Sequence, residues 1–456
     1  MCRWRNTSAI RSIETFNASA DSIALYLFET MPRVNNVNTT DILDAIQLGC
    51  RCMCMCLNAD EDNFPFAGNT VRPHVTLRTS PPYIDIDNPG RFLHPLLAAS
   101  SEFGVSVAEE CIDSISRAVW LSYTGSLPLP LGRDRDEDHN LIDRCAPPIH
   151  MSPHNMREAF LALYSLIRYR DSDRARELAE ATVETLLEVW GPDTDWDYDR
   201  LTRKFGLVIR HRSDLIPGIG RAIGPLTRVY RVTGYGRALE LAITLKEKAL
   251  DGYFVDDGEY DPEMMGTHGH SISAVMLGLA QLADLTSDSN LMNRVKAFYD
   301  NGLWDMRDEL GWSAEDVAPE STDPDRGEAN NTGEIAETAM ILGRWGYTEY
   351  CADAERILRG FLLPSQLRDT SWIEEPPNPE CSDAKRDVAN RLLGAWGFAA
   401  PYGHETVEIG LNKGRLKFNL DVLGGVAGSL CEVYREITRY DQMGHHVNLL
   451  FDHETD

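Results

Sequence analysis

Two glutamates that could serve in acid–base chemistry lie in residues 311–346, GWSAEDVAPESTDPDRGEANNTGEIAETAMILGRWG. Glu328 and Glu337 flank an expected helix start at residues 331–332, where acidic side chains favour the free N–H groups and the helix dipole. One carboxyl could protonate a leaving group while a second activates water. We therefore predict Glu328 and Glu337 as catalytic residues and Trp312, which opens the stretch, as a substrate contact, with a place in the core as its alternative. An ordinary solvated helix start is the alternative.

Histidines and a further carboxylate lie next to other expected helices. His154 precedes a helix that begins near residue 156, while His268 and His270 open another in GTHGHSISAVM. His404 lies in the loop PYGHETVE, and Asp421 stands directly before the last helix. We predict these five residues as substrate-binding, with helix capping as the alternative for the paired histidines. Histidines at i and i+2 do not converge on one ion as i and i+4 do, so no metal is expected.

A repeating helical pattern could bring these residues together. From residue 150 onward, a helix that is apolar on nearly all sides is followed by a polar turn and a helix that is apolar on one side. The four pairs cover residues 156–190, 219–245, 272–299 and 334–362, and a last helix covers residues 421–440. Helices that are apolar all round must be enclosed by the one-sided ones.

With the earlier helices, about six hairpins fit into the chain. We predict an all-α fold, an (α/α)6 toroid of helical hairpins with a short C-terminal β-strand, and an open helical solenoid is the alternative. In a closed ring, the inner helices all begin at the same rim. The candidate site residues would then face one central funnel, although they come from distant segments.

The first third of the chain shows weaker patterns. Helices are expected at residues 8–27, 41–57 and 108–123. Residues 63–92 are rich in proline and aromatic side chains and are expected to form an ordered loop. The acidic segment 126–140 lacks the ligand spacing of a calcium loop and is expected to be a solvated turn.

The C-terminal residues change character. Residues 447–451 have the composition of a strand, and a single strand is not stable alone. We therefore predict a catalytic-type domain over residues 1–445 and a strand-like segment over residues 446–456. That segment either docks on the toroid or a partner, or it begins a β-sandwich.

Composition limits the partners. The formal net charge is −27, which repels nucleic acid and anionic membranes and mildly disfavours polyanionic polysaccharides, unless a local basic pocket overrules the global field.

The sequence has neither an apolar run of membrane-spanning length nor a convincing signal peptide, so we expect a cytoplasmic protein. A carbohydrate is the expected substrate, and a homo-oligomer is compatible with the sequence. Motifs for serine hydrolases, kinases and dinucleotide binding are absent.

Four of the ten cysteines alternate in one expected helix, DAIQLGCRCMCMCLNAD. Cys50 and Cys54 would point to one face of this helix, and Cys52 and Cys56 to the opposite face. The four thiols therefore cannot converge on one ion without unwinding the helix. We interpret them as small buried hydrophobic side chains.

Several segments together resemble the β-L-arabinofuranosidases of glycoside hydrolase family 127 and their six-hairpin relatives. They are GTHGHSISAVMLGLAQL, GWSAED, RGEAN, GEIAETAMI, DAERILRGFLLPSQL and VNLLFDHETD. The resemblance extends from about residue 41 to the C-terminus and implies that Glu328, in the family's G-E-A segment, is the general acid/base.

The same resemblance reveals a departure from the family. There, a second glutamate binds zinc together with three cysteines, one of which is the nucleophile, and this glutamate corresponds to Glu337. The cysteine positions correspond to Ala339, Gly424 and Gly425 in this chain. The family's zinc site and thiolate nucleophile are therefore missing, and no cofactor is expected.

Three functions follow. The first is a glycoside hydrolase that cleaves an oligosaccharide or a plant- or algal-type polysaccharide fragment, with Glu328 as the acid and Glu337 or Asp421 as its partner. The second is a polysaccharide lyase or sugar epimerase in which His268 or His270 is the base. The third is a catalytically inactive carbohydrate-binding or scaffold protein.

Overall fold

The computed structural model describes residues 41–79, 81, 85–318, 326–397, 413–442, 444–451 and 453. The helix expected at residues 8–27 and the predicted contact His404 lie outside these residues.

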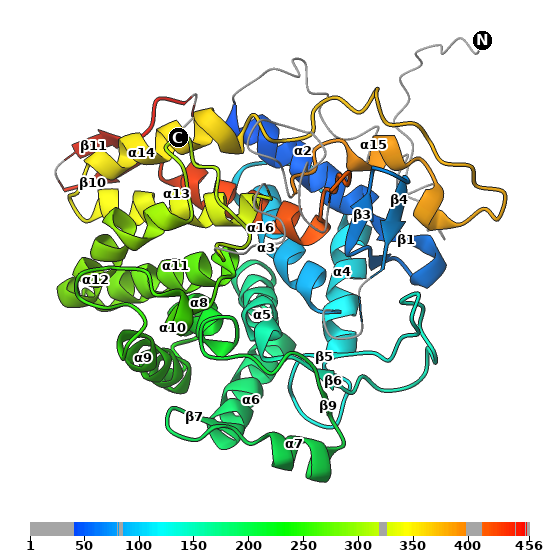
Figure 1. The fold of residues 1–456 in the computed structure, drawn as a ribbon, viewed down its shortest axis with the longest axis horizontal. Coiled ribbons are helices and arrows are strands. Elements are labelled where there is room, and N and C mark those ends of the chain that lie inside the picture. Colours follow the sequence, from blue (N-terminus) through cyan, green and yellow to red (C-terminus); the bar gives the residue numbers. More distant parts are fainter. Residues whose placement is uncertain are drawn as a thin grey trace.

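A closed ring of helices forms the centre of the molecule (Figure 1). Each inner helix packs against the next, and the last one returns to the first. Within the described residues, the six helices of this ring are α3 (Asp87–Glu102), α5 (Met156–Arg170), α8 (Ile223–Thr233), α11 (Gly269–Thr286), α13 (Ala329–Arg344) and α16 (Leu420–Arg435).

An outer layer of helices surrounds the ring (Figure 1). Each outer helix packs on the inner helix next to it in the sequence, except that α2 packs mainly on α16 and so joins the two ends of the ring. In the described part of the chain the outer helices are α2 (Ile42–Met55), α4 (Glu109–Ser122), α6 (Asp173–Val189), α9 (Gly236–Leu250), α12 (Ser289–Asp300) and α14 (Glu349–Ile357). This is the predicted (α/α)6 toroid.

The division into buried and half-buried helices matches the sequence pattern. In α11 nearly every residue up to Ala283 is buried, whereas α12 buries one stripe of five side chains. The stripe consists of Leu291, Met292, Val295, Phe298 and Tyr299. A helix with a single apolar face is stable only where that face covers another element, and α12 covers α11.

Short elements connect the helices. The additional helices are α7 (Tyr198–Phe205), α10 (Pro262–Met265) and α15 (Val388–Leu392). Antiparallel strand pairs are β1 (Leu57–Asn58) with β2 (Phe64–Pro65), β3 (Gly68–Thr70) with β4 (Thr76–Arg78), and β7 (Trp190–Gly191) with β8 (Asp195–Trp196). In a three-stranded sheet, β6 (His150–Met151) lies between β5 (Leu131–Gly132) and β9 (Val208–Ile209).

Two expectations for the first third of the chain were wrong. The loop expected at residues 63–92 ends in the inner helix α3, which begins at Asp87. Pro89 and Gly90 suggest a loop, but a proline in the first turn costs no intrahelical hydrogen bond, and tertiary packing encloses the helix. The expected solvated turn at residues 126–140 contains Arg133 and Arg135, which are buried against Asp85 and other acidic groups.

The C-terminal strand differs from its prediction in register and partner. It is β11 (Gly444–Val447), which pairs antiparallel with β10 (Thr438–Asp441), and α16 ends at Arg435 instead of extending to residue 440. The strand thus finds its partner in its own hairpin beside α14 (Figure 1). The domain boundary predicted at residue 446 falls within β11.

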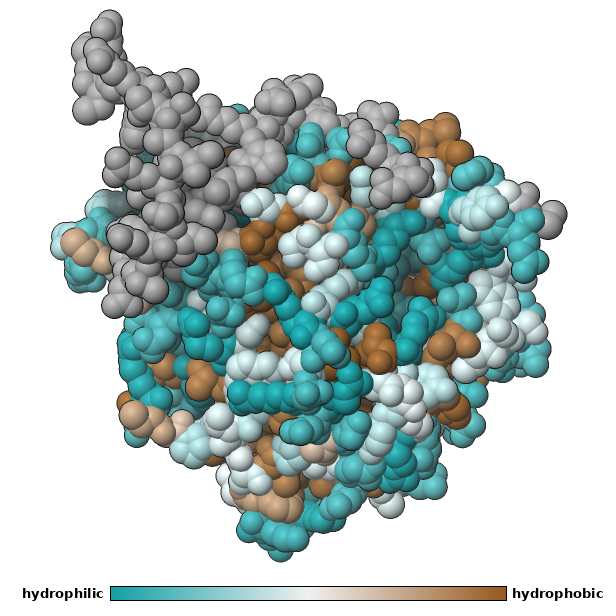
Figure 2. Space-filling view, turned by 180° about the vertical axis from the view of Figure 1, so that it is seen from behind, coloured by the Kyte–Doolittle hydropathy of each residue, from teal (hydrophilic) through white to brown (hydrophobic). Residues whose placement is uncertain are grey.

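The interpretation of the four clustered cysteines was confirmed. Cys50, Cys52, Cys54 and Cys56 are buried in or directly after α2. Among the helices of the described segments, none combines the length and apolar character needed to cross a membrane. The face of the molecule seen in Figure 2 is mainly hydrophilic, with apolar residues in small scattered groups.

Candidate functional site

A cavity of about 530 Å³ lies where the inner helices begin. Asp87 opens α3, His268 and His270 open α11, Glu328 precedes α13, and Asp421 lies in the first turn of α16. The cavity brings together five of the predicted site residues, namely His154, His268, His270, Glu328 and Asp421. Its other lining residues are Asp87, Arg91, Ser152, His211, Arg212, Ser213, Asp214, Pro217 and Glu315.

Glu328 is buried at the base of this cavity, with 3% of its side chain exposed. Its backbone N–H donates to the carbonyl of Ser313 (2.9 Å), and this bond fixes the chain one residue before α13. Burial, with the nearby carboxylates of Glu315 and Asp421, raises the pKa of Glu328 to about 8. Its carboxyl is therefore mainly protonated at neutral pH and can act as an acid.

Both histidines of α11 turn toward Glu328. His270 Nδ1 lies 3.6 Å from Glu328 Oε1, and His268 Nε2 lies 3.9 Å from Glu328 Oε2. Their i and i+2 spacing permits this because His268 is the N-cap residue in extended conformation and lies outside the helical periodicity. The two rings meet edge to face with centroids 6.0 Å apart.

Glu334 fixes the orientation of the His270 ring. His270 Nε2 lies 3.2 Å from Glu334 Oε1, and the Ser273 hydroxyl donates to the other carboxylate oxygen at 2.6 Å. Arg157 donates a further charged hydrogen bond to Glu334. A Glu334 carboxylate held in this way selects the tautomer with the proton on His270 Nε2, leaving the Nδ1 lone pair toward Glu328.

Three histidines of the cavity, His154, His268 and His270, are kept neutral. Burial, aided by the positive charge of Arg221, lowers the pKa of His268 to about 4 and that of His154 well below its usual value. The His154 ring lies 6.1 Å from the His268 ring, and His154 Nδ1 donates to the Pro217 carbonyl at 2.9 Å. The donor tautomer leaves His154 Nε2 as an acceptor.

Arg91 organises the carboxylates around the cavity. Its guanidinium contacts Asp87 at 3.0 Å, Glu158 at 3.1 Å and Asp421 at 3.4 Å. Burial raises the pKa of Asp87 to about 7, in spite of the Arg91 charge. Asp421 is the more accessible of these carboxylates, with 18% of its side chain exposed, and it is held by only one nitrogen of Arg91.

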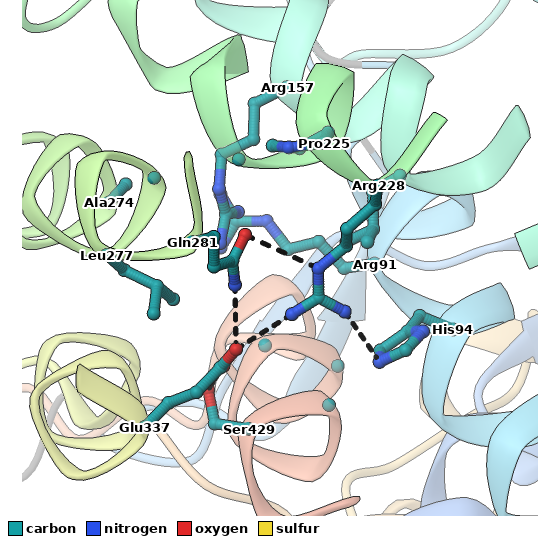
Figure 3. Close-up of a pocket in the computed structure, with 16 residues that line it drawn as sticks. Arg91, His94, Arg157, Pro225, Arg228, Ala274, Leu277, Gln281, Glu337 and Ser429 are labelled. Atoms are coloured by element: carbon teal, nitrogen blue, oxygen red, sulfur yellow. Dashed lines mark hydrogen bonds and ion pairs between the residues drawn. The ribbon is translucent and has the colours of Figure 1, made fainter. Parts of the chain in front are cut away.

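Glu337 lines a different cavity, further along the barrel axis (Figure 3). It accepts from Arg228 at 2.7 Å and from Gln281 at 2.8 Å. Nine residues of α-helix place it roughly 13 Å from Glu328 along α13. Glu337 is not among the residues around the cavity of Glu328, so the structure does not bring the two predicted catalytic carboxyls to one site.

The predicted contact Trp312 packs beside the site. A side chain at Gly327, directly before Glu328, would meet Trp312 Nε1 at 2.3 Å, so the indole lies against this backbone. The helix start expected at residues 331–332 was placed too late, because α13 begins at Ala329 and both residues are buried inside it. Trp312 therefore supports the loop that carries Glu328.

The zinc positions of family 127 have no room for cysteine here. A Cβ atom at Gly425 would lie 2.0 Å from Asn330 Oδ1, and one at Gly424 would lie 2.8 Å from Phe92. A different set, His268, Glu315 and Glu328, has ligand atoms within 4.8 Å of one another. Arg326 already pairs with Glu315 at 2.6 Å, so one of these three side chains is engaged by a cation of the protein itself.

Several site residues were missed in the sequence. Asp87 and Arg91 lie in the segment interpreted as a loop, although their i, i+4 spacing is that of an ion pair on a helix. Glu334 was not among the predicted site residues. The wall formed by residues 211–217 carries no sequence signal that we recognise.

The fold has relatives among solved structures. An unsaturated glucuronyl hydrolase specific for heparin superposes with a TM-score of 0.54 at 11% identity, covering 86% of this chain and 96% of the other. A sugar epimerase from a ruminal bacterium superposes with a TM-score of 0.55 at 12% identity, covering 85% of this chain and 98% of the other. A family 76 α-mannanase from Bacteroides thetaiotaomicron gives 0.54 at 9% identity, covering 88% and 97%.

These similarities establish the six-hairpin toroid, a fold shared by glycoside hydrolases and sugar epimerases. No protein-family model matches the chain, and no curated protein matches it. At such low identity the comparisons define the architecture alone.

Proposed function

We propose that the protein is a glycoside hydrolase in which Glu328 is the general acid. The observation that carries the proposal is a buried carboxyl, protonated at neutral pH, that borders a cavity large enough for a sugar. A general acid must hold its proton at the working pH and release it to the leaving oxygen. The resemblance to family 127 supports the same role for Glu328.

Asp421 is the proposed partner of Glu328. As the glycosidic bond breaks, the Glu328 proton moves to the leaving oxygen and the anomeric carbon becomes electron-poor. A water molecule attacks this carbon while Asp421 takes one of its protons, which yields two sugars with free hydroxyls. Asp87 is the weaker choice of base, because its raised pKa leaves much of it protonated near neutral pH.

His270 and Glu334 act as positioning residues in this scheme. The neutral ring of His270 encloses the Glu328 carboxyl with its Nδ1 3.6 Å from Oε1, which is beyond direct hydrogen-bonding distance, and the Asn330 amide donates to Oε1 at 3.0 Å. Glu334 holds the required tautomer through Nε2.

A sugar epimerase is the second candidate. Three neutral imidazoles, His154, His268 and His270, border one cavity, and a neutral imidazole can accept a proton, although the lowered pKa values make these three weak bases. In this reaction His268 or His270 would remove the proton on the carbon whose configuration changes, and a proton would return on the other face.

One experiment separates the two candidates. Wild-type protein is incubated in D₂O with a panel of oligosaccharides and reducing sugars, and the products are analysed by NMR. Hydrolysis predicts new reducing ends without deuterium on carbon, and this activity should be lost in Glu328→Gln. Deuterium on a sugar carbon with no bond cleavage would overturn the hydrolase proposal in favour of the epimerase.

A further inference from the structure

A strip of positive charge runs along the end of the barrel that holds the cavity. We define this basic strip as Arg72, Arg78, Arg326, Arg415 and Lys417. The whole chain carries a net charge of −27, so a local cluster of basic residues has the opposite sign to the protein as a whole. Such a local patch can attract an anion that the rest of the surface repels.

An extended segment, residues 413–418, presents part of the strip. Leu416 and Phe418 are buried, whereas Lys413 and Arg415 are exposed and Lys417 is half-buried. This alternation is that of an extended chain, which points successive side chains to opposite sides. The segment leads directly into the start of α16, so its basic side chains lie at the same barrel end as Asp421.

Backbone pairing joins this segment to the hairpin of β3 and β4. The N–H of Arg72 donates to the Leu416 carbonyl at 3.4 Å, and the N–H of Leu416 donates back at 3.3 Å. Arg78 ends β4, and the N–H of Phe418 donates to Asn69 of β3 at 2.9 Å. The arginines of the hairpin are therefore held beside Arg415 and Lys417.

The charges of the strip interact. Burial, together with the positive charges of Arg326, Arg78 and Arg415, lowers the pKa of Lys417 to about 8. Burial and the positive charges of Arg415 and Arg326 also lower the pKa of Arg78. A bound anion would relieve this repulsion, so the cluster favours an anionic ligand.

The strip connects two hollows. At one end, Arg326 contacts Glu315, which lines the candidate active-site cavity. At the other end, Arg72 lines a groove of about 730 Å³ together with His74, Trp372 and Lys385, and the groove also contains Glu374 and Glu375. The guanidinium of Arg72 lies 5.8 Å from the centre of the Trp372 ring.

Trp372 suits the groove to a sugar. Its indole N–H donates to the Asp369 carbonyl at 2.8 Å, which fixes the ring in a half-buried position. A fixed indole offers a flat apolar surface, and nearby cationic side chains can pair with carboxylate or sulfate groups. Trp396, by contrast, is fully buried, so of these two tryptophans only Trp372 can contact a ligand.

We infer that the basic strip and the Trp372 groove bind the anionic sugar units of an acidic oligosaccharide whose cleaved end occupies the Glu328 cavity. This inference rests on the proposed function and names its substrate class. Carboxylated and sulfated sugars share the required chemistry.

Binding measurements test this independently of catalysis. Isothermal titration calorimetry on the Glu328→Gln chain would compare three ligands of five or six sugar units, namely an oligogalacturonate, a heparin fragment and a neutral manno-oligosaccharide. We expect at least one acidic ligand to bind more tightly than the neutral one, with an affinity that falls as salt rises from 50 to 300 mM. A preference for carboxylate or sulfate identifies the anionic group.

Variants locate the binding surface. Arg72→Gln and Arg415→Gln should each weaken the acidic ligand by about threefold to tenfold and leave the neutral one unchanged. Trp372→Ala should weaken the binding of an acidic hexasaccharide but not the binding of a disaccharide. Arg203→Gln is the matched control, because Arg203 is an exposed arginine on α7 with 81% of its side chain accessible, and it should have no effect.

Three results would overturn the inference. They are equal affinity for acidic and neutral ligands, equal effects of Arg415→Gln and Arg203→Gln, and binding of single-stranded DNA as tightly as the acidic sugars, which would indicate an unspecific anion patch. Hydrolysis assays are not needed for this test. Failure of the Glu328 mechanism with intact acidic-sugar binding would therefore refute the proposed function and leave the binding surface standing.

Discussion

Glu328 and Glu337 belong to the same segment of chain, but they lie in different parts of the barrel. The comparison distinguishes a carboxyl placed for catalysis from one placed in an ion-pair network. Both are buried, and burial raises the pKa of each, to about 8 for Glu328 and about 7 for Glu337. Glu328 precedes the first turn of α13 and borders a cavity of about 530 Å³. Glu337 lies two and a half turns further on and lines two smaller spaces, of about 40 and 130 Å³.

The surroundings of the two carboxyls differ in charge as well as in space. Arg228 contacts Glu337 at 2.7 Å (Figure 3) and Glu432 at 2.6 Å, so the narrow part of the barrel holds one cation between two acidic side chains. Near Glu328, the Asn330 amide donates to the carboxyl at 3.0 Å and two neutral histidines lie at 3.6 and 3.9 Å. The carboxylates of Glu315 and Asp421 help to raise its pKa. A proton is therefore available at the wide end, while the narrow end forms a structural ion-pair network.

The largest expected effect is on turnover. Glu328→Gln should reduce kcat by about 10³-fold, because the amide cannot protonate a leaving group. Glu337→Gln is the matched substitution on the same helix and should reduce kcat by less than about threefold. Steady-state kinetics on the substrate found with the NMR panel would check this, with circular dichroism as the folding control. An equal loss of kcat in both variants would contradict the assignment of catalysis to Glu328 and of a structural role to Glu337.

A smaller effect is expected on stability. Because the pKa of Glu337 is raised from 4.5 to about 7, the folded protein binds this proton more tightly than the unfolded chain. The stabilisation of the folded state by protonated Glu337 is complete below pH 4.5 and is lost as pH rises to 7. The free energy of unfolding should therefore fall over this range.

Glu337→Gln should flatten that dependence by up to about 3 kcal/mol, since one pKa unit corresponds to about 1.4 kcal/mol. Urea denaturation at pH 5 and pH 7.5 would measure the change. An identical pH dependence in the variant and the wild type would show that Glu337 does not titrate in the folded protein.

The smallest effect is a change in the pH profile. Glu328 loses its proton as pH rises through about 8, so kcat/KM should fall about tenfold per pH unit above that value. The Glu337→Gln profile should show the same alkaline limb. If this limb moves by one unit or more in Glu337→Gln, the two carboxyls are coupled along α13.

The scaffold could be predicted from sequence because it depends on repeated local patterns. Helices that are apolar all round, such as α11, alternate with one-sided helices, such as α12, and burying both kinds requires a closed double layer. The prediction missed α3, whose first turn carries Pro89 and Gly90 and reads as a loop. Its site residues, Asp87 and Arg91, were missed with it.

The site was predictable only in outline. His154, His268, His270, Glu328 and Asp421 share a cavity because residues at the starts of the inner helices meet at one rim. Glu334 gave no signal of its own, since its role depends on a ring from α11 and a guanidinium from α5. Contacts of this kind join positions that are distant in the chain.

The sequence by itself determined which helices are enclosed and which residues stand at their starts, because helical periodicity and burial are properties of short segments. Only the tertiary structure decided that Glu328 faces the cavity while Glu337 pairs with Arg228, and that Gly424 and Gly425 leave no space for a thiol. The physical reason is that local spacing fixes position along a helix, whereas the charge and space around a side chain come from the helices packed against it.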